Sequence, residues 1–375
     1  MYRAGYAKYI LSVFLLMLEL NSVNAQSLSS TLKAIKINCN KTTEYVDFST
    51  VFRIEFIPLE TMTGSLIRKI EKVVVNNDKY VIWDKSQKVI MTFNKNGQFL
   101  NRMASVSSPG PGEFTYCYDI DANNGNVYLL SYKSILVFNE NLEYRKTIKL
   151  KKAYEKFAIV NERAYLYNND QNPADREKVG FVFLQNGEES HPLLFEHREL
   201  GMFNLVEVFN FTRSSDGVLF FYPLTDTIYS ILNDKIYPKY ILEFGDRKFA
   251  KNAFDKIPND PLSPMKLANS LRETKFAYWP SGFVCNQLGT MFSFSLSDKI
   301  LYYYKSLSGN QQFLTNGFKI DGMVFNFIFQ GYSDNTIITS ANPWELTENT
   351  KRRIAPGGNN IVEDANPVLI ILHKM

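Results

Sequence analysis

A unit of four short strands recurs along this sequence, and the repeat constrains the fold more than any other feature. The clearest copy covers residues 70–103, where the segments IEKVVV, KYVIWD and VIMTFN are rich in β-branched and aromatic residues. Its last turn, NKNG at 94–97, is a strong hairpin signal because Asn and Gly accept positive φ. A repeated meander of this kind is typical of a β-propeller, in which each unit forms one blade.

Further copies of the unit follow at uneven spacing. Their second strands begin near residues 80, 127, 164, 218, 291 and 336. Most steps are close to the roughly 40–50 residues typical of propeller blades. The longest step contains an insertion at 246–280, in which residues 263–275 are expected to form a short surface helix. Two other insertions, 169–178 and 343–366, are expected to be loops because they are polar or rich in Gly and Asn.

The last unit lacks one strand, since it offers only 323–329, 335–340 and 368–373. An alternating strand, Val51–Leu59, precedes the first complete unit, and pairing it with the last blade would protect open sheet edges. The chain is therefore predicted to be an all-β protein, a six-bladed β-propeller of four-stranded blades closed by an N-terminal strand. A two-domain β-sandwich does not predict one recurring unit, and a β-helix needs shorter, more uniform coils.

The first 25 residues have the pattern of a secretory signal peptide. Two basic residues precede ten mostly apolar residues at 9–18, and a small-x-Ala pattern ends at Ala25. The apolar run is shorter than the about 20 residues that span a bilayer. Cleavage is expected between Ala25 and Gln26, which leaves 26–375 as a single propeller domain without a transmembrane segment. The mature chain is expected in the periplasm, at the periphery of the outer membrane, or secreted.

Charge and cysteine content narrow the choice of partners. Removing residues 1–25 takes away two basic residues and one acidic residue, which lowers the formal net charge from +4 to +3. A charge this small and dispersed argues against a nucleic-acid partner. Cys39, Cys117 and Cys285 allow at most one disulfide in an oxidising compartment, and their pairing stays open.

Three stretches of the chain resemble a known family. They are FIPLET at 56–61 with the KYVIWD strand behind it, GPGEF at 110–114, and PLTDTIY at 223–229 with PKY at 238–240 and FG at 244–245. Over residues 45–375, the chain resembles the six-bladed β-propeller proteins exported by Gram-negative bacteria, which are related to the TolB-like and NHL-repeat propellers. The resemblance implies fold and export but no particular activity. Many of these relatives carry a lipidated Cys at the mature N-terminus, which this chain lacks.

The candidate functional residues lie where the innermost strands begin. Ligands of propellers usually bind at the mouth of the central channel, which these strands line. Five of the six strands have a carboxylate or an amide near their start: Glu71, Asp119, Glu155, Glu207 and Asn326. Facing the channel, these groups would form a ring for a cation or a polar ligand. Converging carboxylates repel one another, so the ring needs a cation or a basic side chain, and Arg68, Lys72 and Lys156 are near in sequence.

Two classes of function fit this sequence. The first is a binding or scaffold propeller that recognises a protein, a peptide or a glycan and needs no cofactor. The second is a metal-dependent propeller enzyme, similar to lactonases or lyases, for which calcium is the expected cation because the available ligands are all oxygens. The fold supports both classes. The sequence has three histidines and no zinc, calcium or nucleophile motif, so binding is expected rather than catalysis.

Overall fold

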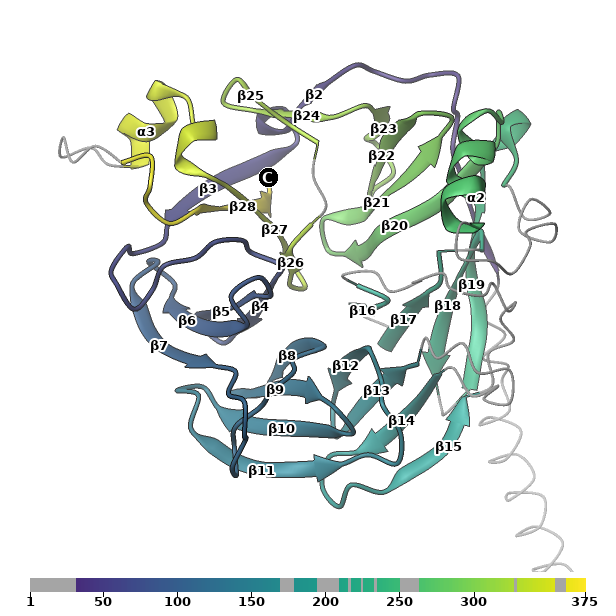
Figure 1. Ribbon diagram of the computed structural model, residues 1–375. Helices are drawn as coiled ribbons and strands as arrows, with labels where there is room; N and C mark the ends of the chain where they lie inside the picture. Colours follow the sequence, from purple (N-terminus) through teal and green to yellow (C-terminus); the bar gives the residue numbers. More distant parts are fainter. Residues whose placement is uncertain are drawn as a thin grey trace, which may run out of the picture.

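The computed structural model describes residues 32–168, 179–193, 209–214, 217–223, 225–232, 235–249, 263–326, 329–354 and 362–375. In these ranges, seven β-sheets are arranged around a central axis (Figure 1). Six of the sheets contain a four-stranded antiparallel meander with its first strand nearest the axis. The predicted all-β propeller is therefore confirmed.

The six four-stranded meanders follow one another along the chain. From the axis outward, the first blade has β4 (Lys72–Asn76), β5 (Lys79–Asp84), β6 (Val89–Asn94) and β7 (Phe99–Ala104). The second has β8 (Asp119–Asn123), β9 (Asn126–Ser131), β10 (Ser134–Asn139) and β11 (Tyr144–Lys149). The third has β12 (Lys156–Val160), β13 (Arg163–Tyr167), β14 (Val179–Phe183) and β15 (Glu189–Leu193). The next two have the strands β16 (Phe211–Ser214), β17 (Gly217–Phe221), β18 (Thr227–Leu232) and β19 (Lys235–Glu243); and β20 (Ala277–Asn286), β21 (Gly289–Leu296), β22 (Lys299–Ser306) and β23 (Gln312–Thr315). The last has β26 (Gly331–Tyr332), β27 (Thr336–Ala341), β28 (Val368–Lys374) and β3 (Phe52–Pro58).

The seventh sheet corrects the predicted number of blades, because the structure has seven rather than six. It is a small sheet of β2 (Val46–Asp47), β24 (Phe318–Ile320) and β25 (Met323–Phe325). Residues 323–329 were predicted to begin the last blade. Instead, Asp321 and Gly322 both have positive φ and close a two-residue hairpin between β24 and β25. The innermost strand of the last blade is β26, which comes later in the chain.

The N-terminal part of the chain contributes strands to three different sheets. β3 pairs with β28 from Phe52↔Lys374 to Pro58↔Val368, so the predicted closing strand is confirmed. β1 (Lys33–Lys36) adds a parallel fifth strand to the outer edge of β19, and β2 pairs in parallel with β24. Neither β1 nor β2 could be predicted, because strands of four and two residues carry no clear alternation.

Closure of the ring brings the last blade against the first at its centre. The backbone N–H of Val73 donates to the carbonyl oxygen of Gln330 at 2.6 Å, and Gln330 Nε2 donates to the carbonyl oxygen of Ile70 at 2.9 Å. A Cβ at Gly331 would lie 2.5 Å from the carbonyl oxygen of Val73. Only a glycine at this position allows the backbones of β26 and β4 to approach so closely.

Aromatic and branched side chains fill the spaces between neighbouring sheets. Between the first two blades, for example, Val81, Trp83 and Ile90 pack with Leu129 and Phe138. The inner strands of the blades are largely buried on both faces, which explains why the sequence contains 29 Phe and 22 Tyr.

Asparagine side chains tie the ends of innermost strands to the next blade. Asn76 Oδ1 accepts a hydrogen bond from the backbone N–H of Gly125 at 3.2 Å. Asn123 Nδ2 donates to the carbonyl oxygen of Asn161 at 3.4 Å. These contacts show that the innermost strands end at the same side of the propeller, and therefore begin together at the other side. We call that other side the strand-start face.

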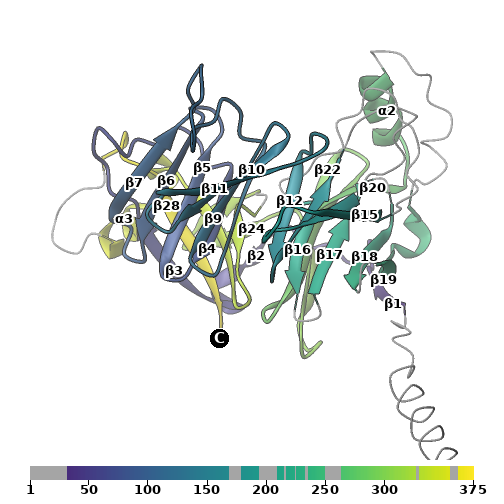
Figure 2. The same cartoon turned by 90° about the horizontal axis from the view of Figure 1, so that it is seen from below.

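Short helices occupy the insertions. α2 (Ser263–Arg272) confirms the predicted helix and lies outside the ring of sheets (Figure 2). The insertion at 343–366 was predicted to be a loop but contains the 3₁₀ turn Pro343–Glu345 and α3 (Glu348–Ile354). Two further 3₁₀ turns are Phe48–Thr50 and Gly245–Arg247. The predicted signal peptide and the insertion at 169–178 lie outside the described residues. None of the described helices is long and apolar enough to cross a membrane.

Candidate functional site

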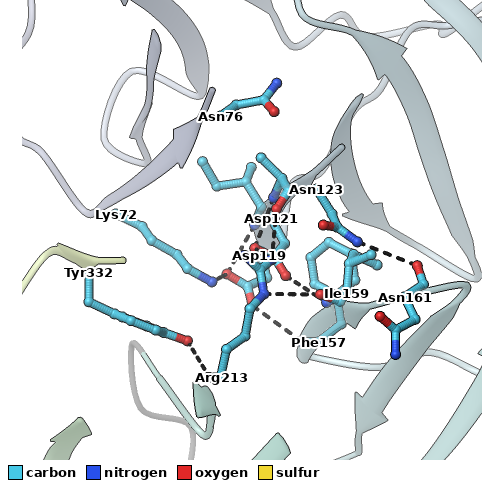
Figure 3. Close-up of polar contacts among 12 residues, drawn as sticks. Lys72, Asn76, Asp119, Asp121, Asn123, Phe157, Ile159, Asn161, Arg213 and Tyr332 are labelled. Atoms are coloured by element: carbon cyan, nitrogen blue, oxygen red, sulfur yellow. Dashed lines mark hydrogen bonds and ion pairs between the residues drawn. The ribbon is translucent and has the colours of Figure 1, made fainter. Parts of the chain in front are cut away.

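A buried set of charged side chains lies where the innermost strands begin. Asp119, the first residue of β8, lies beside Lys72 of β4 (Figure 3). Its Oδ1 is 2.8 Å from Lys72 Nζ and 3.8 Å from the Nζ of Lys156, the first residue of β12. The three side chains are 1–7% exposed. Two ammonium groups therefore share one buried carboxylate.

A second carboxylate, Asp121, lies on the same face of β8 because side chains two residues apart in a strand point the same way. One of its oxygens accepts from the guanidinium of Arg213 in β16, and the other accepts from the backbone N–H of Ile159 at 2.6 Å. Arg213 Nη2 also donates to the carbonyl oxygen of Ala122 at 2.7 Å. The backbone N–H of Arg213 donates to the Tyr332 hydroxyl at 2.8 Å (Figure 3).

We call these six residues the central network: Lys72, Asp119, Asp121, Lys156, Arg213 and Tyr332. They come from the innermost strands of five blades. Burial opposes the charged form of Arg213, but Asp121, Tyr332 and Asp334 together outweigh burial and raise the pKa of the guanidinium. Arg213 and Asp121 therefore remain a fixed ion pair that joins blades.

Lys156 is held less firmly than Lys72. Burial lowers the pKa of Lys156, while the nearby Asp119 carboxylate opposes that change. Aromatic rings provide part of the surroundings of both ammonium groups. Lys156 Nζ lies 5.9 Å from the ring centroid of Trp83, and Lys72 Nζ lies 5.3 Å from that of Phe209.

Three tyrosines are grouped at the strand-start face, and we call them the tyrosine cluster: Tyr116, Tyr118 and Tyr132. Tyr116 and Tyr118 precede β8, and Tyr132 directly follows β9, its antiparallel partner. The ring centroids of Tyr116 and Tyr118 are 6.5 Å apart, with an angle of 23° between the ring planes. Tyr116 is 57% exposed and Tyr132 is 60% exposed.

The pKa of Tyr118 responds to the charges of Glu155 and of the other two tyrosines of the cluster, which are therefore close to it. Burial raises the pKa of Tyr118, and the charge of Glu155 raises it further, followed by smaller effects of Tyr116 and Tyr132. Glu155 precedes Lys156, so the cluster lies next to the central network. The site thus combines exposed aromatic rings, carboxylates at its rim and buried ammonium groups beneath.

The predicted ring of polar residues is only partly assembled. Glu71 and Glu155 are half-buried at the strand-start face, whereas Asp119 is 1% exposed within the central network. Asn326 directly follows β25 of the small seventh sheet and is exposed. Its amide nitrogen lies 3.1 Å from the carbonyl oxygen of Asn316. Glu207 lies outside the described residues. The basic partners found for Asp119 are Lys72 and Lys156, two of the three suggested by the sequence.

Several residues of the site were not identified from the sequence. Arg213 and Tyr332 are separated from Asp121 by 92 and more residues, so only the closed ring brings them together. The tyrosine cluster was included in strands or turns. A useful signal was the alternation of Asp119 and Asp121, which places two carboxylates on one face of a strand.

Other reactive groups lie outside this site or are poorly suited to chemistry. Among the described residues, no group of three His, Cys, Asp or Glu side chains is placed to hold a metal ion. All three cysteines are free and half-buried. Burial raises the pKa of Cys39 to about 11 and that of Cys117 well above its usual value, so both thiols stay protonated at neutral pH.

A cavity of about 760 Å³ lies at the outer edge of the fourth blade, where β1 joins β19. Its lining mixes three cations with two carboxylates: Lys36, Arg247, Lys305, Glu243 and Asp246. This mixture gives the cavity no clear preference for a charged ligand.

Comparisons with known proteins support the fold and leave the activity open. A family model described as "Domain of unknown function (DUF4934)" matches residues 32–373. The crystal structure of a "Putative exported protein" from Bacteroides fragilis NCTC 9343 has a TM-score of 0.72 at 12% identity, covering 92% of this chain and 100% of that one. A member of the DUF4221 family from Bacteroides vulgatus ATCC 8482 has a TM-score of 0.51 at 10% identity, covering 86% and 96%. No curated protein matches the chain. These comparisons show no TolB-like or NHL-repeat family, to which the motifs were expected to relate the chain.

Proposed function

This chain belongs to the family described as "Domain of unknown function (DUF4934)", and we propose that it is an exported binding propeller that holds a glycan on its strand-start face. Export is supported by the signal-peptide pattern of residues 1–25. The description of the B. fragilis protein as exported is consistent with it. The compartment of action would be the periplasm or the outer-membrane periphery.

The tyrosine cluster is the observation that carries the glycan proposal. Large exposed aromatic rings grouped on one surface mark an interaction site, because isolated domains rarely leave such groups uncovered. The faces of phenol rings pack against the C–H faces of sugar rings, and the Tyr hydroxyls can donate and accept hydrogen bonds. Glu71 and Glu155 at the same face accept hydrogen bonds when ionised, and sugar hydroxyls supply the donors.

The central network supports binding rather than catalysis. A general acid or base must be able to exchange protons with a substrate. Asp121 is fixed by Arg213 and by a backbone N–H, and Asp119 is held by Lys72 and is 1% exposed. These carboxylates serve to join blades, so the network is a rigid base on which the binding surface stands.

Binding of polysaccharides to the purified mature chain tests the proposal. We expect at least one soluble polysaccharide from a panel of neutral and acidic polymers to bind in isothermal titration calorimetry. The double variant Tyr116→Ala/Tyr132→Ala should weaken that binding by roughly tenfold or more, since each aromatic contact contributes about 1 kcal/mol. Trp344→Ala removes a ring that is 62% exposed outside the cluster and should leave affinity unchanged. Equal affinity of the double variant, or binding of peptides alone, would contradict the proposal.

Calcium titration tests the other class of function, a metal-dependent enzyme. Glu71 and Glu155 are the carboxylates at the strand-start face that a hard cation could reach. Calcium heat that disappears in Glu71→Gln would make the enzyme class the better description. We expect none, because ammonium groups already neutralise Asp119.

A further inference from the structure

Three carboxylates near the strand-start face already have specific partners. Glu71 Oε2 lies 3.8 Å from Lys69 Nζ, and Asp119 lies 2.8 Å from Lys72 Nζ. Asp84 accepts hydrogen bonds from the backbone N–H groups of Arg68 at 2.7 Å and Lys69 at 3.1 Å. Its pKa is lowered, because these and other hydrogen bonds outweigh the opposing effect of burial. Glu71 and Asp119 are therefore paired with lysines, and the charge of Asp84 is stabilised by hydrogen bonds from neutral groups.

Three further lysines add positive charge at the same face. Lys85 and Lys133 are exposed, and neither has an ion pair with a carboxylate in the described part of the chain. Each instead has its Nζ over an aromatic ring, 5.8 Å from the centroid of Trp83 for Lys85 and 5.6 Å from that of Tyr132 for Lys133. Within the described residues, Lys156 forms one ion pair, at 3.8 Å, with a carboxylate that Lys72 holds more closely.

Like charges in this group repel one another. The charges of Lys72 and Lys85 both act against the charged form of Lys156. An anion placed over the strand-start face would relieve this repulsion. The surplus positive charge would attract such an anion at short range, where salt does not yet screen the interaction. Lys133 lies beside the tyrosine cluster, so a ligand stacked on the tyrosines would be in reach of its ammonium group.

We propose that the glycan bound at the strand-start face is acidic, carrying carboxylate or sulfate groups that the exposed Lys85 and Lys133 recognise, with the buried charge of Lys156 adding to the attraction from beneath. The inference rests on the proposed function. An acidic glycan matches the three elements of the site together: sugar rings for the tyrosines, hydroxyl donors for Glu71 and Glu155, and anions for the lysines. A nucleic-acid backbone or an acidic peptide supplies the anions, but few hydroxyl donors for the two carboxylates.

The test compares polymers that differ in charge but share a backbone. Polygalacturonate and its fully methyl-esterified form, together with a sulfated and an unsulfated dextran, are titrated into the mature chain at low and high salt. We expect the acidic member of at least one pair to bind about tenfold more tightly at low salt and to lose that preference at high salt. A single-stranded DNA oligomer and polyglutamate serve as anionic ligands without sugar hydroxyls in that density.

Variants assign the preference to the lysines. Lys85→Gln/Lys133→Gln should reduce the preference for the acidic member severalfold, since each exposed charge contributes up to about fivefold. Lys305→Gln, which removes an exposed lysine at the cavity beside β1, should not change it. If neutral and acidic members bind equally and Tyr116→Ala/Tyr132→Ala weakens both, the inference is wrong while the proposed function stands. If no polysaccharide binds, the proposed function fails. Stronger binding of DNA or polyglutamate than of every polysaccharide would overturn the inference in favour of those classes.

Discussion

Replacing Asp119 with Asn should destabilise the propeller strongly. In Asp119→Asn, the single amide oxygen can keep the hydrogen bond from the backbone N–H of Ile120 at 3.0 Å, whereas the longer one from Phe157 to the other oxygen, at 3.3 Å, is lost. The negative charge shared by Lys72 and Lys156 is lost, and both ammonium groups, whose side chains are 6% and 7% exposed, remain without compensation. Breaking a buried ion pair by removing one partner costs about 3–5 kcal/mol. That cost is a large fraction of the about 5–15 kcal/mol that stabilises a typical folded domain.

Urea unfolding followed by circular dichroism and by tryptophan fluorescence measures this loss. Trp83 lies 5.9 Å from Lys156 Nζ, so its emission reports on the central network directly. Asp78→Asn is the matched control, because it removes one carboxylate from an exposed turn and should change the free energy of unfolding by less than about 0.5 kcal/mol. Adding Lys156→Met to Asp119→Asn removes one uncompensated charge and should recover part of the lost stability. A loss below about 1 kcal/mol in Asp119→Asn, or no recovery in the double variant, would refute the reasoning.

Three further predictions concern closure and burial. Deleting residues 26–60 removes the partner of β28, so the protein should aggregate in size-exclusion chromatography; a soluble variant with unchanged melting would contradict this. Gly331→Ala should cost about 1–3 kcal/mol in urea unfolding, because its Cβ would lie 2.5 Å from a backbone oxygen, whereas Gly64→Ala, 3.9 Å from the nearest atom, should be nearly neutral. Burial raises the pKa of each tyrosine in 302–304 from 10.0 to about 12. Because the unfolded chain loses these protons first, stability should be full below pH 10 and fall between pH 10 and 12, as measured by melting temperature; a flat profile would show that these hydroxyls ionise equally in both states.

The repeat and the closing strand could be predicted because local sequence determines them. The alternating FRIEFIP of β3 and the NKNG turn carry their own signals, and each was found in place. The blade number was missed because β24 and β25 have three residues each, too few for a periodic pattern. The Asp321-Gly322 dipeptide between them was nevertheless a recognisable hairpin signal.

The candidate site was only partly predictable, since its residues meet through the ring and not through the sequence. Glu71, Asp119 and Glu155 lie near the start of an innermost strand, as expected from their place in the repeat. Asn326 instead follows β25 of the small sheet and does not belong to the innermost strand of the last blade. The ion pair of Asp121 with Arg213 depends on how neighbouring blades are rotated about the axis, and no local pattern encodes that rotation.

The paired strands β3 and β28 also determine when the protein can finish folding. Phe52 and its partner Lys374 are separated by 322 positions. The strand β3, which is synthesised early, therefore cannot pair until the last residues have been made. At about 5–20 residues per second, synthesis of the intervening segment takes on the order of tens of seconds. During this time β28, the partner of β3, does not yet exist, and contacts so distant in sequence form slowly. The closed ring is thus delayed until the whole chain has emerged, although blades made of consecutive strands can form earlier.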